Sequence, residues 1–69
     1  MDRLPVSSSN LASVGYDPSS MTLEIEFKDG SLYQYFDVPV AVYQGLMNAD
    51  SKGTFFSQNL RNDYRYTRL

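Results

Sequence analysis

The strongest constraint on the fold is a segment of eight residues, MTLEIEFK at 21–28, in which apolar and polar side chains alternate without exception. The apolar residues occupy the odd positions, so an extended chain places all four of them on one face. This period of two predicts a strand that is buried on one side and polar on the other. Other segments of the chain must then cover the apolar face.

A hairpin is predicted to follow this strand. Asp29-Gly30 is a strong turn signal, and the apolar and aromatic run SLYQYF begins directly after it. A two-residue turn would leave Tyr33 and Tyr35 on the polar face, whereas a three-residue loop with Gly30 in the left-handed conformation would place both on the apolar stripe. We favour the three-residue loop, because it packs two large aromatic side chains against the apolar strand.

Three further segments and the tail complete the predicted fold. Residues 11–16 form a first short strand, residues 39–49 form a helix that begins at a proline, and residues 53–61 form a second short helix. Gly45 weakens the first helix by about 1 kcal/mol, so a close packing contact is its expected reason. The tail at 63–69 alternates weakly and is compatible with a strand or an irregular extension. The predicted fold is α+β, a three-stranded antiparallel meander packed on two short helices.

A chain of 69 residues is expected to form one domain, residues 1–69, with a core close to the minimum for independent folding. Ten aromatic residues make disorder improbable. The core expected from the strand and helix periods consists of Leu23, Ile25, Phe27, Tyr33, Tyr35, Val42, Leu46, Phe56 and Leu60.

The sequence contains neither cysteine nor histidine. Disulfides, thiolate nucleophiles and imidazole acid–base chemistry are therefore excluded, and the usual zinc ligands are absent. Glu24 and Glu26 share one strand face, but no third metal ligand is evident, and an ordinary solvent-facing surface is the expectation. We predict no catalytic residue, no metal site and no cofactor, hence a protein that is not an enzyme.

The charge is distributed unevenly. Residues 1–58 carry three basic and seven acidic side chains, a net charge of -4, whereas residues 59–69 carry three arginines and one aspartate, a net charge of +2. Arginine binds phosphate oxygens in a bidentate manner, and neighbouring rings can stack on bases. The candidate ligand-binding residues of this segment are Arg61, Tyr64, Arg65, Tyr66 and Arg68. The alternative is a solvated tail whose arginines pair with carboxylates.

A second candidate lies before the second helix, at Ser51, Lys52 and Gly53. Backbone N–H groups at a helix N-terminus attract anions, and Lys52 would add positive charge. The alternative is an ordinary serine N-cap with a glycine that permits the turn.

No apolar run approaches the roughly 20 residues that cross a bilayer, and the first ten residues lack the apolar stretch of a signal peptide. A cytoplasmic location with no membrane contact is the expectation.

The order and spacing of motifs across residues 6–68 are specific. They are Ser8, Val14-Gly15-Tyr16-Asp17, the strand with Leu23, Ile25 and Phe27, then Gly30, Tyr33-x-Tyr35, Val38-Pro39, Tyr43-x-x-Leu46, Ala49-x-Ser51-x-Gly53, Phe56 and Leu60-Arg61-x-x-Tyr64. This pattern resembles the KTSC domain, a small module found at the C-terminus of some lysyl-tRNA synthetases and as a stand-alone bacterial or phage protein. The chain departs from the usual pattern at Phe55, Ser57 and Leu60. The synthetase context of the family implies RNA binding.

Three classes of function are compatible with these residues. The first is a non-enzymatic binding module for RNA or another phosphate-bearing ligand. The second is a protein-interaction module, homo-oligomer or small phage-type inhibitor that acts through an acidic face or through the apolar Leu32 and Phe36, since Tyr and Arg also favour protein interfaces. The third is a binder of a small nucleotide at a subunit interface. Affinity that falls steeply with salt would distinguish the first class.

Overall fold

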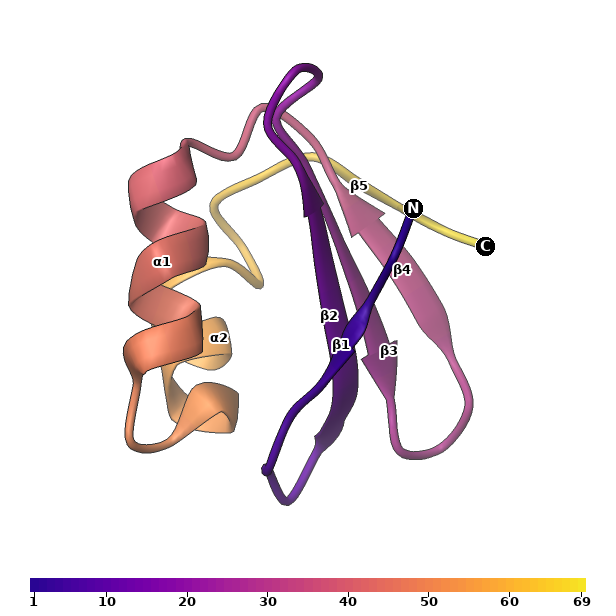
Figure 1. Cartoon of the computed structure of the whole chain (residues 1–69), viewed down its shortest axis with the longest axis vertical. Coiled ribbons are helices and arrows are strands. Elements are labelled where there is room, and N and C mark those ends of the chain that lie inside the picture. The colour runs from indigo at the N-terminus through magenta and orange to yellow at the C-terminus, as the bar shows by residue number, and fades with distance from the viewer.

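Five strands and two helices follow one another along residues 1–69, all of which the computed structural model describes. The strands form one antiparallel sheet in the order β1-β2-β3-β4-β5, and both helices cover the same face of it (Figure 1). Neither helix has the length and apolar character needed to span a bilayer. The elements are β1 (Leu4–Pro5), β2 (Leu11–Asp17), β3 (Thr22–Phe27), β4 (Leu32–Tyr35), α1 (Val40–Asn48), α2 (Lys52–Asn59) and β5 (Tyr66–Arg68).

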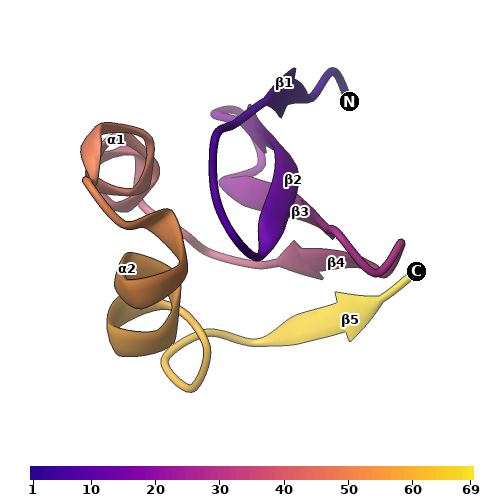
Figure 2. The ribbon, with the colours of Figure 1, turned by 90° about the horizontal axis from the view of Figure 1, so that it is seen from below.

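The α+β class is confirmed, but the sheet has five strands where three were predicted. The three predicted strands are β2, β3 and β4, and the two additional ones are the short edge strands β1 and β5. These edge strands have two and three residues, and every residue in both is exposed. Neither strand buries a face, so no alternating apolar pattern predicts β1. The weak alternation of residues 63–69 left a strand or an irregular extension open, and the structure has a strand at Tyr66–Arg68. Seen from below, the strands form an arc from β1 to β5 beside the helices (Figure 2).

The register of the β3–β4 hairpin confirms the three-residue loop. Ile25 lies opposite Tyr33, and Leu23 lies opposite Tyr35, as that loop requires. Gly30 has a φ of 91°, in the left-handed region. Both tyrosines therefore lie on the sheet face that packs against the helices, which we call the inner face.

The core lies between the inner face and the two helices. Six of the nine predicted core residues are buried, whereas Phe27, Tyr33 and Val42 are only half-buried. Phe27 and Tyr33 stay partly accessible, although Phe27 contacts Phe56 of α2. The buried apolar residues are Leu11, Val14, Leu23, Ile25, Tyr35, Val38, Leu46, Phe56 and Leu60.

Two aromatic contacts hold the helix layer in place. Tyr16 of β2 stacks on Tyr43 of α1 with ring centroids 4.8 Å apart, and its hydroxyl donates to the carbonyl of Val38. A Cβ added to Gly45 would lie 2.8 Å from the ring of Phe55. This is the close packing contact expected for the glycine inside α1, and it brings α1 and α2 together.

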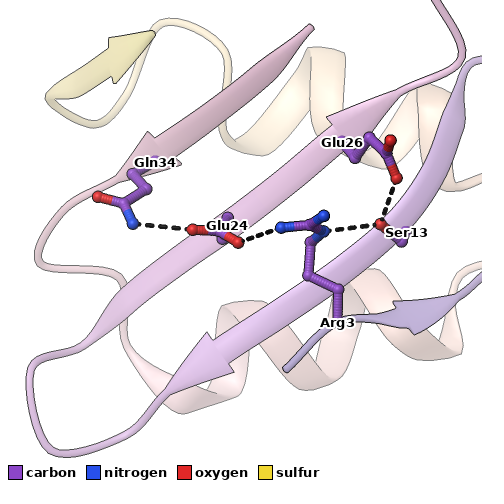
Figure 3. Close-up of polar contacts among 5 residues, drawn as sticks. All are labelled: Arg3, Ser13, Glu24, Glu26 and Gln34. Carbon is purple, nitrogen blue, oxygen red and sulfur yellow. Dashed lines mark hydrogen bonds and ion pairs between the residues drawn. The ribbon is translucent and has the colours of Figure 1, made fainter. Parts of the chain in front are cut away.

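The outer face of the sheet carries a polar network that the sequence interpretation did not include (Figure 3). Glu24 was expected on an ordinary solvent-facing surface, and this expectation is wrong, since the residue is only 5% exposed. Its carboxylate forms an ion pair with Arg3 and accepts a hydrogen bond of 2.8 Å from the Gln34 amide. Arg3 also donates to Ser13, whose hydroxyl donates to Glu26.

The N-terminal segment reaches this network because Gly15 lets it approach β2 closely. A Cβ on Gly15 would lie 2.5 Å from the backbone oxygen of Asp2 and 3.0 Å from Cγ of Arg3. Arg3 thus crosses the outer face and covers Glu24. The two carboxylates are held by protein donors, and the chain contains no cluster of three acidic side chains that could bind a metal ion.

Replacing Gly30 with valine should destabilise the fold by about 1–3 kcal/mol, because a β-branched residue adopts positive φ only under strain. A Cβ at this position would meet no atom within 4 Å, so the loss would come from the backbone alone. Urea unfolding measures the loss. Gly30→Asn is the control and should keep most of the stability, since asparagine tolerates this conformation. Equal losses for both variants would contradict the assignment.

Replacing Arg3 with alanine should cost about 2 kcal/mol at pH 7, because it leaves the buried carboxylate of Glu24 without its cationic partner. Arg65→Ala is the control. It removes an ion pair with Asp37 whose side chains are 77% and 74% exposed, and such pairs contribute less than about 1 kcal/mol. Urea unfolding at pH 7 compares the two variants.

The effect of Arg3→Ala should also depend on pH. Burial raises the pKa of Glu24, but hydrogen bonds from Gln34 and Arg3 and the charge of Arg3 outweigh it and hold the pKa below the ordinary 4.5. A lowered pKa in the folded state contributes stability above pH 4.5 that is lost as the pH falls through the folded-state value. The stability difference between parent and variant should therefore shrink at pH 3. A difference that stays constant from pH 7 to pH 3 would rule out this role for Glu24.

Candidate nucleic-acid interface

A groove of about 730 Å³ opens between α2 and the inner face of the sheet. The β3–β4 hairpin and β5 form one wall, and α2 with the turn that follows it forms the other. Its volume lies in the range of about 300–1,000 Å³ that is typical of ligand sites. The lining residues are Ser9, Asn10, Leu11, Phe27, Lys28, Asp29, Ser31, Tyr33, Tyr35, Gly53, Phe56, Ser57, Arg61, Asn62 and Tyr66.

Five aromatic rings line this groove and contact one another. Phe27 packs edge-to-face on Tyr33 and on Phe56, with centroids 5.7 and 5.3 Å apart. Tyr66 lies 5.5 Å from Tyr35 and 5.8 Å from Tyr33. Tyr66 is 56% exposed and Tyr33 is half-buried, so the cluster offers ring surface to the solvent. Such surface can stack on a planar ligand.

The positive charge beside the groove comes from arginines that have no carboxylate partner. Arg3 and Arg65 form the two ion pairs of the chain. The other two arginines lie at the groove: Arg61 lines it, and the Arg68 guanidinium lies 5.7 Å from the centroid of the Tyr33 ring. Lys28 lines the groove as well. Arg61 and Arg68 form no ion pair, although Asp29 lies near enough for the charge of Arg68 to act on it. An anion in the groove would therefore meet two guanidinium groups and one ammonium against a single carboxylate.

Asp29 is the one acidic side chain that lines the groove, and its carboxylate is hydrogen-bonded within the β3–β4 turn. It accepts hydrogen bonds from the hydroxyl and the backbone N–H of Ser31, at 2.6 and 2.9 Å. These two hydrogen bonds lower the pKa of Asp29. The carboxylate thus stays ionised and serves the hairpin loop.

The structure separates the five candidate residues of the C-terminal segment. Arg61 and Tyr66 line the groove, and Arg68 lies beside it on Tyr33. Arg65 lies elsewhere, where it pairs with Asp37 and covers the ring of Phe36. Tyr64 is half-buried and packs against the core.

The three candidates before α2 also have distinct places. Ser51 is the N-cap of α2 and accepts a hydrogen bond from the Thr54 backbone N–H, which agrees with the ordinary capping interpretation. The ammonium of Lys52 lies 3.4 Å from the carbonyl oxygen of Ala49. Gly53 lines the groove, and a Cβ there would lie 3.3 Å from the Asn10 side chain.

A smaller polar hollow of about 280 Å³ continues from the groove. It shares four residues with the groove. Apart from one glycine, every residue that lines it has a hydroxyl or amide side chain. The lining residues are Ser9, Asn10, Ser51, Gly53, Thr54, Ser57 and Gln58. Sequence interpretation missed Ser9 and Asn10, because a short polar run before a strand has the composition of an ordinary loop.

Comparison with known proteins gives a consistent result. The profile of the KTSC domain family matches residues 7–64. A crystal structure of a KTSC domain protein from Yersinia pestis superposes with a TM-score of 0.94 at 42% sequence identity, over 99% of this chain and 96% of that one.

Two sequence relatives differ in length. An uncharacterized protein from Stutzerimonas stutzeri (strain A1501) is 47% identical over 70 residues, covering 100% of this chain and 99% of the relative. A lysine–tRNA ligase from Nostoc sp. (strain PCC 7120) is 43% identical over 54 residues, which are 78% of this chain but only 10% of the ligase. The resemblance found in the sequence is thereby confirmed, and the chain belongs to the KTSC domain family.

Proposed function

We propose that this chain is a non-enzymatic RNA-binding module whose groove holds unpaired nucleotides of a single strand. The observation that carries the proposal is that exposed aromatic surface and the two arginines without a carboxylate partner, Arg61 and Arg68, occur together. Base stacking on an aromatic side chain contributes about 1–3 kcal/mol, and guanidinium groups bind phosphate oxygens in a bidentate manner. Base and phosphate would each find a complementary group here.

The net charge of -2 is compatible with this proposal, because only one of the eight acidic side chains, Asp29, lines the groove and four others are engaged elsewhere. Glu24 and Glu26 belong to the network on the outer face. Asp37 pairs with Arg65, and Asp17 accepts hydrogen bonds from serines in its own turn. The local charge at the groove therefore differs in sign from the charge of the whole chain.

The relatives support RNA as the polyanion. Lysine–tRNA ligases from Nostoc sp., Trichormus variabilis and Nostoc punctiforme contain a region 41–43% identical to this chain, and that region is about a tenth of each ligase. The occurrence of a similar region in ligases named for tRNA favours RNA over other polyanions as the ligand. A cytoplasmic location belongs to the same proposal.

The other two classes of function have less support from the geometry. Leu32 and Phe36 are half-buried, and the Arg65 guanidinium lies 5.4 Å from the centroid of the Phe36 ring, so the two residues do not form a free apolar face. The groove is formed within one chain, so a small nucleotide would not need a subunit interface.

Replacing Arg61 or Arg68 with alanine should weaken the binding of a labelled single-stranded oligoribonucleotide. Each lost phosphate contact should lower the slope of log affinity against log salt by about 0.7. Fluorescence anisotropy between about 50 and 200 mM KCl measures both quantities. Neither side chain forms an ion pair, so the melting temperature should fall by a few degrees at most, as the exposed contact of Arg68 with the Tyr33 ring is lost.

Arg65→Ala is the matched control, since it removes the same charge four residues from Arg61 and three from Arg68, but outside the groove. It should leave the salt slope unchanged. A parent protein with no salt-dependent RNA binding, or an Arg61→Ala/Arg68→Ala protein that binds as the parent does, would refute the proposal. The protein-interaction class would then take its place.

A further inference from the structure

A tyrosine that is almost fully buried presents an unpartnered hydroxyl to the groove. Tyr35 is 3% exposed and lines the groove, yet its hydroxyl makes no hydrogen bond within the chain. No polar side-chain atom of the chain is both sealed from solvent and unpartnered. The small accessible part of Tyr35 must therefore include the hydroxyl oxygen, which faces the groove.

The rings around Tyr35 fix the orientation of this hydroxyl. Phe56 contacts the Tyr35 ring edge-to-face at 5.5 Å, Tyr66 lies at 5.5 Å on a tilted plane, and Tyr33 is stacked at 6.4 Å. A ring held by three others has little rotational freedom, so the hydroxyl is presented at a defined place. The half-buried Tyr16 shows the contrast, since its hydroxyl donates to the carbonyl of Val38.

The hydroxyl stays neutral over the whole physiological range. Burial raises the pKa of Tyr35 to about 12, and the neighbouring Tyr33 and Tyr66 hydroxyls add to the effect. A neutral phenol can donate one hydrogen bond and accept another. Such a hydroxyl can donate to a phosphate oxygen or to the carbonyl oxygen or ring nitrogen of a base. The base is the better complement here, because the hydroxyl lies among aromatic rings on which a planar base can stack.

Resting on the proposed function, we infer that the groove holds one unstacked base of a single-stranded RNA, whose hydrogen-bonding edge meets the Tyr35 hydroxyl. The exposed Tyr66 ring would cover a face of this base. The Arg61 guanidinium would hold the adjoining phosphate. Tyr35 is then the residue that distinguishes one base from another, whereas the arginines bind any sequence equally.

A substitution of Tyr35 by phenylalanine tests this role, because it removes only the hydroxyl. Tyr43→Phe is the matched control. The Tyr43 hydroxyl also makes no hydrogen bond within the chain, but Tyr43 lies in α1, outside the groove, and its ring stacks on Tyr16 of β2. Affinities are measured by anisotropy for labelled uridine, adenosine and cytidine decamers and for a decamer without bases.

In the parent, one homopolymer should bind more tightly than the others. Tyr35→Phe should lower the affinity for that homopolymer about threefold to tenfold and reduce the differences among the three, since a net hydrogen bond contributes about 0.5–1.5 kcal/mol. The salt slope and the binding of the strand without bases should stay unchanged, as should every affinity of Tyr43→Phe. Melting temperatures verify the fold.

The unmodified protein provides an independent measurement. With tyrosine labelled by ¹³C at Cζ, the resonance that disappears in Tyr35→Phe should shift on addition of the preferred homopolymer and not on addition of the strand without bases. Salt-dependent binding with no homopolymer preference, or with a preference that Tyr35→Phe leaves intact, would overturn this inference while the proposed function stands. A parent that binds none of the strands would refute both and would leave a protein segment as the occupant.

Discussion

The register of the β3–β4 hairpin decides where the aromatic side chains of this chain lie. Side chains alternate between the faces of a sheet, so a shift by one residue would move Tyr33 and Tyr35 to the outer face. The loop with Gly30 at positive φ holds the register in which both tyrosines pair across from the apolar side chains of β3. The core and the aromatic groove both depend on this one loop, since Tyr35 belongs to each of them.

Local patterns were sufficient to predict the central hairpin, both helices and the α+β class. The alternation at 21–28, the Asp-Gly turn and the helical spacing around Leu46 are all properties of neighbouring residues. The basic and aromatic tail likewise identified Arg61, Tyr66 and Arg68, which the structure brings to one face. Arg65 has the same local composition, but the path of the chain after α2 directs it to Asp37. Composition cannot distinguish residues that only the tertiary path separates.

Glu24 illustrates what a single-sequence pattern misses. A glutamate at a polar position of an amphipathic strand is normally solvated, and its burial here needs Arg3, 21 residues away in the sequence. That contact in turn needs Gly15, where a side chain would displace the N-terminal segment. No local signal connects these three positions. The network gives the outer face of the sheet a cover of its own and engages its two carboxylates on the side opposite the groove.

A domain this small has few large side chains to spare, so one that leaves aromatic surface at a groove must stabilise itself in another way. The rings of the groove contact one another as well as the core, and each therefore contributes to the fold while one edge or face stays accessible. Mutual packing also fixes their orientation before any ligand arrives, which reduces the conformational entropy lost on binding. Because Phe56 reaches the sheet from α2 and contacts both Phe27 and Tyr35, the same side chain that closes the core supports the groove. Stability and binding capacity thus depend on one shared cluster.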